Sequence, residues 1–85
     1  MKWDYKLKSG KKLRKALFDE DVDKIIDALY DCYAELLDAG FIDEDDYDRY
    51  TEDFDFYDAD DVESIDYELD NLYDLCDSLR VWVEI

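Results

Sequence analysis

Carboxylates are the side chains in this sequence that could do chemistry, and they are concentrated between positions 43 and 61. This segment, DEDDYDRYTEDFDFYDADD, has eleven acids among nineteen residues and Arg49 as its only cation, so it carries ten net negative charges. Such a cluster could bind divalent cations, catalyse acid–base reactions or attract a partner rich in Lys and Arg. The acids are Asp43, Glu44, Asp45, Asp46, Asp48, Glu52, Asp53, Asp55, Asp58, Asp60 and Asp61.

The spacing of these acids does not match a dedicated metal site. A calcium-binding EF-hand loop has Gly at its sixth position and Glu at its twelfth. A loop starting at Asp43 would place Asp48 and Phe54 there, a loop starting at Asp58 also fails, and the segment contains no Gly. Zinc lacks a ligand set, because the chain has no His and its two Cys are far apart. We expect weak, non-specific divalent binding, no metal site and no cofactor.

The sequence also lacks the signatures of catalysis. It contains no His, no G-x-S-x-G, no phosphate-binding P-loop and no glycine-rich turn. A helical chain of 85 residues has little room for a deep cleft. Cys32 and Cys76 fall on the apolar stripes of two expected helices, which favours buried, reduced thiols. We therefore expect no enzymatic activity and no catalytic residues.

Acids also recur in rows at helical spacing elsewhere in the chain. Neighbours four residues apart on a helix lie about 6 Å apart along its axis, inside the Debye length of about 8 Å, so they repel each other. Each such pair costs about 0.2–0.5 kcal/mol. One row could be an ordinary solvated face, but two rows with almost no interleaved Lys favour a function, namely imitation of the charges on a nucleic-acid backbone. The rows are Asp23, Asp27, Asp31 and Glu35, continued by Asp38, and Glu63, Asp66, Asp70, Asp74 and Asp77.

Aromatic residues among the acids indicate that the 43–61 segment is folded. Disordered acidic tails have few aromatics, because they have nothing to bury. A Tyr can also supply a rigid contact surface on which Arg stacks, so we include Tyr47 and Tyr57 in the candidate partner-binding surface. The alternative is that these rings pack at the edge of the core with their hydroxyls in water. The five aromatics are Tyr47, Tyr50, Phe54, Phe56 and Tyr57.

Hydrophobic periodicity supplies the elements that would hold these acids. Alternation around Trp3, Tyr5 and Leu7 predicts a strand, Ser9-Gly10 a turn, and the spacing that follows a helix over 11–18. An apolar stripe predicts a helix over 21–39, with the acids at 19–21 at its start and Gly40 just past its end.

The second half of the chain follows the same logic. Asp43 suits the N-cap of a helix that runs to about residue 54, and Phe56 and Tyr57 are expected to enter the core from a connecting turn. Asp58 or Asp60 would cap a fourth helix ending at Arg80, and alternation over 81–85 predicts a terminal strand. The fourth helix would bury Val62, Ile65, Leu69, Leu72, Tyr73, Cys76 and Leu79.

An isolated strand is unstable, so the two terminal strands are expected to pair, either parallel or antiparallel. The prediction is a helix-rich α+β fold of about four helices with paired N- and C-terminal strands (βααααβ), in a single domain over 1–85. Within it we distinguish a basic strand and first helix (1–18), an acidic helical body (19–79) and the terminal strand (81–85).

Charge is divided unevenly between these parts. Residues 1–18 have seven Lys or Arg against one Asp, a net charge of +6, whereas the other 67 residues have three cations against 26 acids, a net charge of −23. The total of −17 argues against direct binding to nucleic acid or to an anionic membrane. The basic segment could neutralise part of the acidic body or contact a second protomer. With no apolar run of eighteen residues and no signal peptide, we expect a soluble cytoplasmic protein, either a monomer or a small homo-oligomer.

In size, charge and aromatic content, the segment 43–61 and the two acidic rows resemble the phage-encoded DNA-mimic inhibitors of the anti-CRISPR and antirestriction type. The resemblance implies a stoichiometric inhibitor, in the cytoplasm of an infected bacterial host, that occupies the Lys/Arg-lined cleft of a DNA-binding protein or RNA-guided nuclease. The basic segment departs from a uniformly acidic mimic and leaves a second contact open, such as one to guide RNA. The alternative functions are an acidic adaptor or chaperone that shields a basic protein, and a halophilic protein whose acidity is an adaptation to salt.

Overall fold

Four α-helices and a pair of three-residue strands form the part of the chain that the computed structural model describes, residues 5–57 and 63–83. The elements are β1 (Tyr5–Leu7), α1 (Gly10–Asp19), α2 (Val22–Asp38), α3 (Glu44–Thr51), the short 3₁₀-helix η1 (Phe54–Phe56), α4 (Asp66–Leu79) and β2 (Val81–Val83). This order confirms the predicted βααααβ fold. Among the described residues, no helix has the length and apolar character needed to cross a membrane.

The two terminal strands pair in parallel, which settles the direction that the sequence left open. Tyr5 lies opposite Val81 and Leu7 opposite Val83. Parallel neighbours require a long crossover connection, and all four helices provide it here. Leu7 and Val81 are fully buried, so the ribbon closes one end of the core. Trp3 and Ile85, also predicted in these strands, lie outside the described residues.

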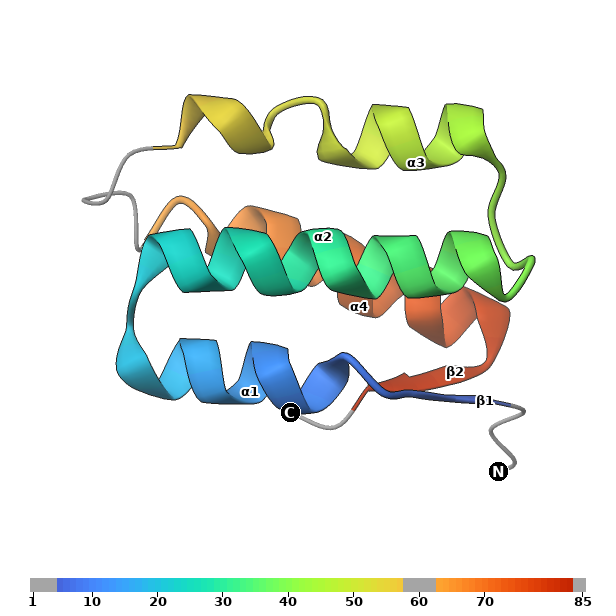
Figure 1. Cartoon of the computed structure of the whole chain (residues 1–85), viewed down its shortest axis with the longest axis horizontal. Coiled ribbons are helices and arrows are strands. Elements are labelled where there is room, and N and C mark those ends of the chain that lie inside the picture. The colour runs from blue at the N-terminus through green and yellow to red at the C-terminus, as the bar shows by residue number, and fades with distance from the viewer. Residues whose placement is uncertain (1–4, 58–62, 84–85) are drawn as a thin grey trace.

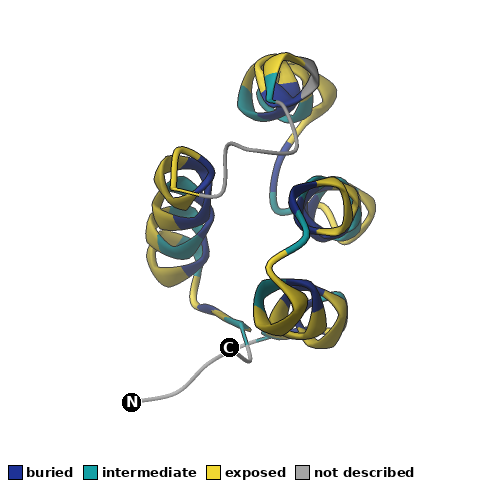
Figure 2. Ribbon diagram, turned by 90° about the vertical axis from the view of Figure 1, so that its left-hand side faces the viewer, coloured by how far each residue is buried: buried dark blue, intermediate teal, exposed yellow. Residues whose placement is uncertain are grey.

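The helices form two layers around one apolar core. Helices α1, α2 and α3 lie side by side with α2 in the middle, and α4 covers the other side (Figures 1 and 2). Figure 2 shows the buried faces of the helices turned toward one another. The stripes predicted for α2 and α4 supply most of this core, which contains Leu13, Ile25, Leu29, Cys32, Tyr33, Leu36, Phe54, Ile65, Leu72 and Cys76.

Local capping fixes where α2 and α3 begin and where α2 ends. The Asp21 and Asp43 carboxylates accept hydrogen bonds from the backbone N–H groups of Lys24 and Asp46, respectively. At the end of α2, Gly40 has φ +86°, and the N–H groups of Gly40 and Phe41 donate to the carbonyls of Leu37 and Leu36. These two hydrogen bonds form a Schellman motif, so the predicted N-cap at Asp43, the predicted acid at the start of α2 and the glycine at its end are confirmed.

Three details of the sequence prediction are wrong. Helix α3 stops at Thr51 instead of about residue 54, and the chain continues into the 3₁₀-helix η1 at Phe54. Phe54 still reaches the core from η1, but Phe56 is 80% exposed. A 3₁₀-helix has three residues per turn, so two residues two positions apart cannot share one face. Finally, Gly10 is the first residue of α1 and not part of the preceding turn.

The start of the fourth helix differs from the prediction as well. Helix α4 begins at Asp66, and Ile65 is buried immediately before it. The expected caps Asp58 and Asp60, with the expected core residue Val62, lie outside the described residues.

Candidate interaction surface

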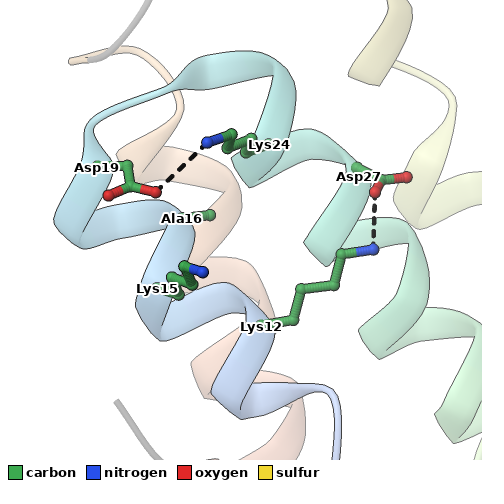
Figure 3. A pocket seen from close by; sticks show the side chains of 6 residues that line it. All are labelled: Lys12, Lys15, Ala16, Asp19, Lys24 and Asp27. Atoms are coloured by element: carbon green, nitrogen blue, oxygen red, sulfur yellow. Dashed lines mark hydrogen bonds and ion pairs between the residues drawn. The ribbon is translucent and has the colours of Figure 1, made fainter.

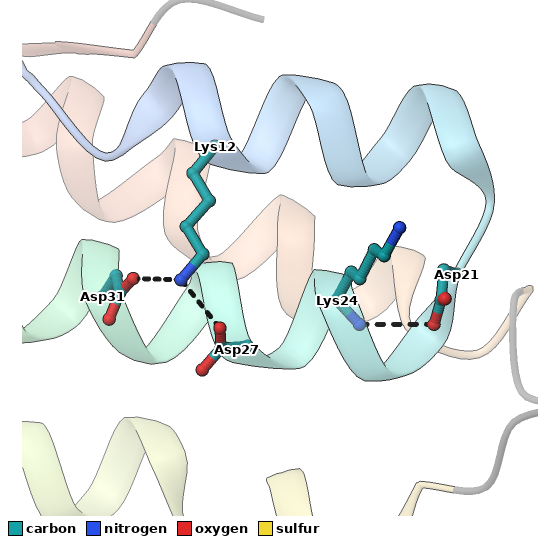
Figure 4. A network of polar contacts seen from close by, with 5 residues as sticks. All are labelled: Lys12, Asp21, Lys24, Asp27 and Asp31. Carbon is teal, nitrogen blue, oxygen red and sulfur yellow. Dashed lines mark hydrogen bonds and ion pairs between the residues drawn. The ribbon is translucent and has the colours of Figure 1, made fainter.

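The acidic row on α2 is engaged within the molecule by the basic helix beside it. The ammonium group of Lys12 on α1 lies 2.7 Å from the Asp27 carboxylate and 2.6 Å from that of Asp31 (Figure 4). These two hydrogen bonds, led by the one to Asp27, raise the pKa of Lys12. Part of the basic segment therefore neutralises the acidic body, as one of the two sequence interpretations proposed.

Glu35, the last acid of that row in the candidate set, has a structural role. Its carboxylate accepts hydrogen bonds from the Tyr5 hydroxyl at 2.7 Å and from the N–H groups of Lys8 at 2.9 Å and Ser9 at 2.8 Å. Desolvation alone would raise its pKa, but the hydrogen bonds from Lys8, Tyr5 and Ser9 outweigh it and hold the pKa below the usual value. Glu35 thus fastens the turn between β1 and α1 to the middle of the fold.

A second contact joins α1 and α2 at their corner. Lys24 reaches the Asp19 carboxylate at 3.5 Å, and the two helices enclose a hollow of about 270 Å³ (Figure 3). Both Lys and Asp side chains line this hollow, so it belongs to the region where charges on α1 and α2 pair. The lining residues are Lys12, Lys15, Ala16, Asp19, Lys24 and Asp27. Of the predicted α2 row, Asp23 and Asp38 remain exposed, with no ion pair in the described part of the chain.

Helix α3 presents its acids to solvent. In the described chain its one ion pair joins Arg49 to Asp46 at 2.7 Å, and the Arg49 guanidinium lies 5.5 Å from the centre of the Tyr50 ring. Three acids occupy the first turn, where they meet the positive end of the helix dipole. We call the exposed acids of this helix and its end the α3 acidic edge: Glu44, Asp45, Asp48, Glu52 and Asp53.

Aromatic side chains fix the α3 acidic edge to the core. The Tyr50 ring stacks on buried Tyr33 with centroids 5.3 Å apart, and Phe54 meets Tyr30 edge-on at 5.0 Å. Tyr47 is half-buried against the same core, and its carbonyl accepts a hydrogen bond from the Thr51 hydroxyl at 2.8 Å. The carboxylates are therefore held on a rigid support, and Tyr47 serves as an anchor more than as an exposed contact.

Helix α4 carries the second exposed acidic row. Asp66, Asp70, Asp74 and Asp77 are all exposed, and within residues 5–57 and 63–83 none of them forms an ion pair. Steps of four residues place successive carboxylates about 6 Å apart along the axis. The opposite face of the helix packs into the core through Leu69, Leu72 and Cys76.

One acid on α4 points inward, which the sequence interpretation missed. Glu68 is 4% exposed, and it accepts a hydrogen bond from the Tyr57 hydroxyl at 2.9 Å. Its position was readable, because it lies three residues after Ile65 and four before Leu72, on the buried stripe. This hydrogen bond joins the end of η1 to the first turn of α4, and it explains why the Tyr57 ring is half-buried.

Two exposed aromatics flank this contact. Phe56 precedes Tyr57 and is 80% exposed, and Tyr67 precedes Glu68 and is 68% exposed. Because Tyr57 and Glu68 touch, the two rings lie where the α3–η1 and α4 segments meet. The sequence interpretation assigned Phe56 to the core and gave Tyr67 no specific role. The sequence signal that could have indicated these exposed rings is a run of acids interrupted by aromatics at a helix end.

Four candidate acids remain, at positions 55, 58, 60 and 61. Asp55 belongs to η1, and Asp58, Asp60 and Asp61 lie outside the described residues. Cys32 and Cys76 are free and buried, and burial raises the pKa of each thiol to about 12. Within the two described ranges, no three His, Cys, Asp or Glu side chains are grouped so that they could hold a metal ion.

The chain matches no protein-family model, no curated protein and no solved structure.

Proposed function

We propose that this protein is a DNA-mimic inhibitor that occupies the nucleic-acid-binding cleft of a host defence nuclease, of the CRISPR or restriction type. The observation that carries the proposal is the contrast between its acidic rows. On α2, Asp27, Asp31 and Glu35 are bonded to α1, to β1 and to the turn between them, whereas the acids of the α3 acidic edge and of α4 face solvent.

The exposed rows offer what a phosphate-binding cleft recognises. Such clefts use Lys and Arg to neutralise regularly spaced negative charges, and an Arg can hold a carboxylate by two parallel hydrogen bonds. Carboxylates that are already fixed by helices lose little freedom when they bind. The exposed rings of Phe56 and Tyr67 add faces on which an Arg side chain can stack beside the acids.

Unpaired like charges on one helix lower its stability, which a purely structural surface would avoid. Each neighbouring pair in the α4 row, such as Asp70 and Asp74, costs about 0.2–0.5 kcal/mol, whereas a Lys in place of one acid would reverse the sign. Asp is also a poor helix former compared with Glu or Lys. The repeated use of Asp along both rows supports a role for the charges in binding.

The test is inhibition of DNA cleavage by a panel of RNA-guided nucleases and restriction enzymes. We expect one enzyme to be inhibited at a 1:1 ratio, with duplex DNA competing and with affinity falling steeply as salt rises. The quadruple variant D45N/D48N/E52Q/D53N should remain helical by circular dichroism and lose affinity by more than about tenfold.

A matched control separates a defined surface from bulk charge. The variant D23N/D27N/D31N/D38N removes four charges from α2, as the first variant does from the α3 acidic edge, and should keep its affinity. Equal losses in both variants would contradict the proposal. Binding to many unrelated basic proteins, without competition by duplex DNA, would instead support the chaperone alternative.

A further inference from the structure

The outer face of α1 carries cations and one exposed ring in a single row. Lys11, Arg14, Lys15 and Phe18 follow the i, i+3, i+4, i+7 spacing of one helix face, and together they line a shallow hollow of about 390 Å³. Phe18 is 88% exposed, more than the other large apolar side chains among the described residues. The face therefore combines positive charge with one apolar ring.

Lys11 and Lys15 on this face differ from Lys12 in their contacts, although Lys15 also lines the hollow between α1 and α2. Lys12 points to α2 and is held by two carboxylates, whereas Lys11 and Lys15 form no ion pair within the described part of the chain. Lys11 and Lys15 are one helical turn apart, so their charges are spaced about 6 Å along the axis.

The opposite edge of the same layer has the complementary arrangement. Helices α1 and α3 flank α2 on its two sides and run in the same direction, both opposite to α2 (Figure 1). Along α1, the cations come first and Phe18 follows near the end. Along α3 and η1, Asp48 and Glu52 come first, also one turn apart, and exposed Phe56 follows. The two edges therefore match in charge spacing, order and direction.

We infer that the chain associates head to tail with a second copy of itself, by docking the α1 face of one copy on the α3–η1 edge of the next. A shift of one copy across the layer, without rotation, brings Lys11 and Lys15 toward Asp48 and Glu52, with Phe18 next to Phe56. Such a contact joins two different surfaces, so each copy keeps one free edge and the association is open-ended.

Electrostatics favour this occupant over a nucleic acid. A phosphate chain longer than α1 would have to continue along a molecule whose net charge is −17, where it would be repelled. A second copy also carries a net charge of −17, but it meets the cations with carboxylates, and at physiological salt the repulsion between charges elsewhere in the two copies is screened beyond about 8 Å. The contact involves one helix edge on each side, so it should be weak and sensitive to salt.

Sedimentation velocity over a range of protein concentrations tests this inference. We expect the mean mass of the full chain to rise with concentration at about 0.15 M salt and to fall toward the monomer at about 1 M salt, where a Debye length of about 3 Å screens the contact itself. The variants K11Q/K15Q and D48N/E52Q should each weaken self-association by about tenfold, because each removes both charges on one side of the contact. The control D70N/D74N removes two acids with the same spacing from α4 and should self-associate like the natural chain.

Mixing the two disabled variants gives the sharpest result. K11Q/K15Q keeps an intact acidic edge and D48N/E52Q keeps an intact basic face, so an equimolar mixture should form 1:1 dimers and nothing larger. A chain that stays monomeric at about 1 mM and about 0.15 M salt, or a mixture that stays monomeric, would overturn the inference. So would binding of a labelled single-stranded RNA through Lys11 and Lys15 without self-association. Because K11Q/K15Q leaves the α3 acidic edge intact, it should still inhibit the nuclease, which keeps this test separate from the proposed function.

Discussion

Among single residues, half-buried Glu35 has a polar group with several hydrogen-bond partners, whereas buried Tyr33 has one without a partner in the described part of the chain. The Glu35 carboxylate accepts three hydrogen bonds, one from Tyr5 on β1 and two from the β1–α1 turn. The Tyr33 hydroxyl is buried and has no hydrogen-bond partner within the described part of the chain. A satisfied polar group fixes the structure around it, whereas an unsatisfied one lowers stability. The two residues should therefore respond in opposite ways to removal of their polar atoms.

Replacement of Glu35 by Gln should lower the free energy of unfolding by about 1–2 kcal/mol. The amide offers only one accepting oxygen, and its NH₂ group would face donors. Urea denaturation measures the change, and the exposed acid Asp38 provides the control, since Asp38→Asn should shift stability by less than about 0.5 kcal/mol.

The effect of Glu35 should also depend on pH. The folded-state pKa of Glu35 lies below its usual value, so its contribution to stability is complete above the unfolded pKa of about 4.3. That contribution is lost as the pH falls through the folded pKa. The difference in stability between the natural chain and the Glu35→Gln variant should therefore shrink on acidification, and a constant difference would contradict this role. Comparing the two chains cancels the titration of the other acids.

Replacement of Tyr33 by Phe should raise the free energy of unfolding by about 1 kcal/mol, because it removes a buried hydroxyl and keeps the ring that stacks on Tyr50. Burial raises the pKa of Tyr33 above the usual value of about 10. In an absorbance titration, the number of tyrosines that ionise near pH 10 should therefore be the same in the variant as in the natural chain. A lower melting temperature, or one fewer tyrosine titrating there, would show that the hydroxyl has a partner.

Among the elements, three helices end with a residue in the left-handed conformation, and these residues differ in how well they suit it. Helix α2 ends with Gly40 in the left-handed region, which suits glycine, but α1 and α4 end with Glu20 at φ 54° and Arg80 at φ 59°. A side chain in that region costs energy because its Cβ crowds the backbone. Glu20 also puts a negative charge at the negative end of the α1 dipole, whereas the charge of Arg80 at the end of α4 has the favourable sign.

Replacement of Glu20 by Gly should therefore stabilise the protein by about 0.5–1 kcal/mol, and replacement of Gly40 by Ala should destabilise it by about 1 kcal/mol. A Cβ at Gly40 would meet no atom within 4 Å, so the loss there would come from the backbone conformation alone. Thermal denaturation of both variants checks the pair. Two shifts of the same sign would contradict this explanation of the helix ends.

At the scale of the whole molecule, the distribution of charge sets both stability and binding. Two faces of the helical layers remain negative after Lys12 and Lys24 have paired, and α1 forms a positive edge. Like charges on the α3 acidic edge and on α4 repel each other in the folded state more than in the extended chain. Binding to a basic cleft would remove this repulsion, so the same charges that weaken the isolated fold strengthen the proposed complex.

Added salt should accordingly raise the melting temperature. Between about 0.01 M and about 0.1 M NaCl the Debye length falls from about 30 Å to about 10 Å, which screens the repulsion within the acidic rows. The variant D70N/D74N should melt higher than the natural chain in dilute buffer and respond less to salt. A chain that is unfolded in dilute buffer and folds only in molar salt would instead support the halophilic alternative.

Features that depend on short-range spacing could be predicted from the amino-acid sequence. The stripes through Leu29 and Leu72, the caps at Asp21 and Asp43 and the turn at Gly40 all follow from the 3.6-residue period and from which residues satisfy a helix end. The exposure of most acids on α3 and α4 followed from the same periodicity.

Which charges remain available for binding depends on how the helices pack and could not be predicted from spacing. That Asp27 and Asp31 face Lys12, and that Glu35 holds a turn 26 residues away at Ser9, depends on α1 packing beside α2. The parallel direction of β1 and β2 and the outward turn of Phe56 were likewise settled by packing. Such contacts join residues far apart in the chain, and no local periodicity specifies them, because their energy depends on the arrangement of whole helices around a shared core.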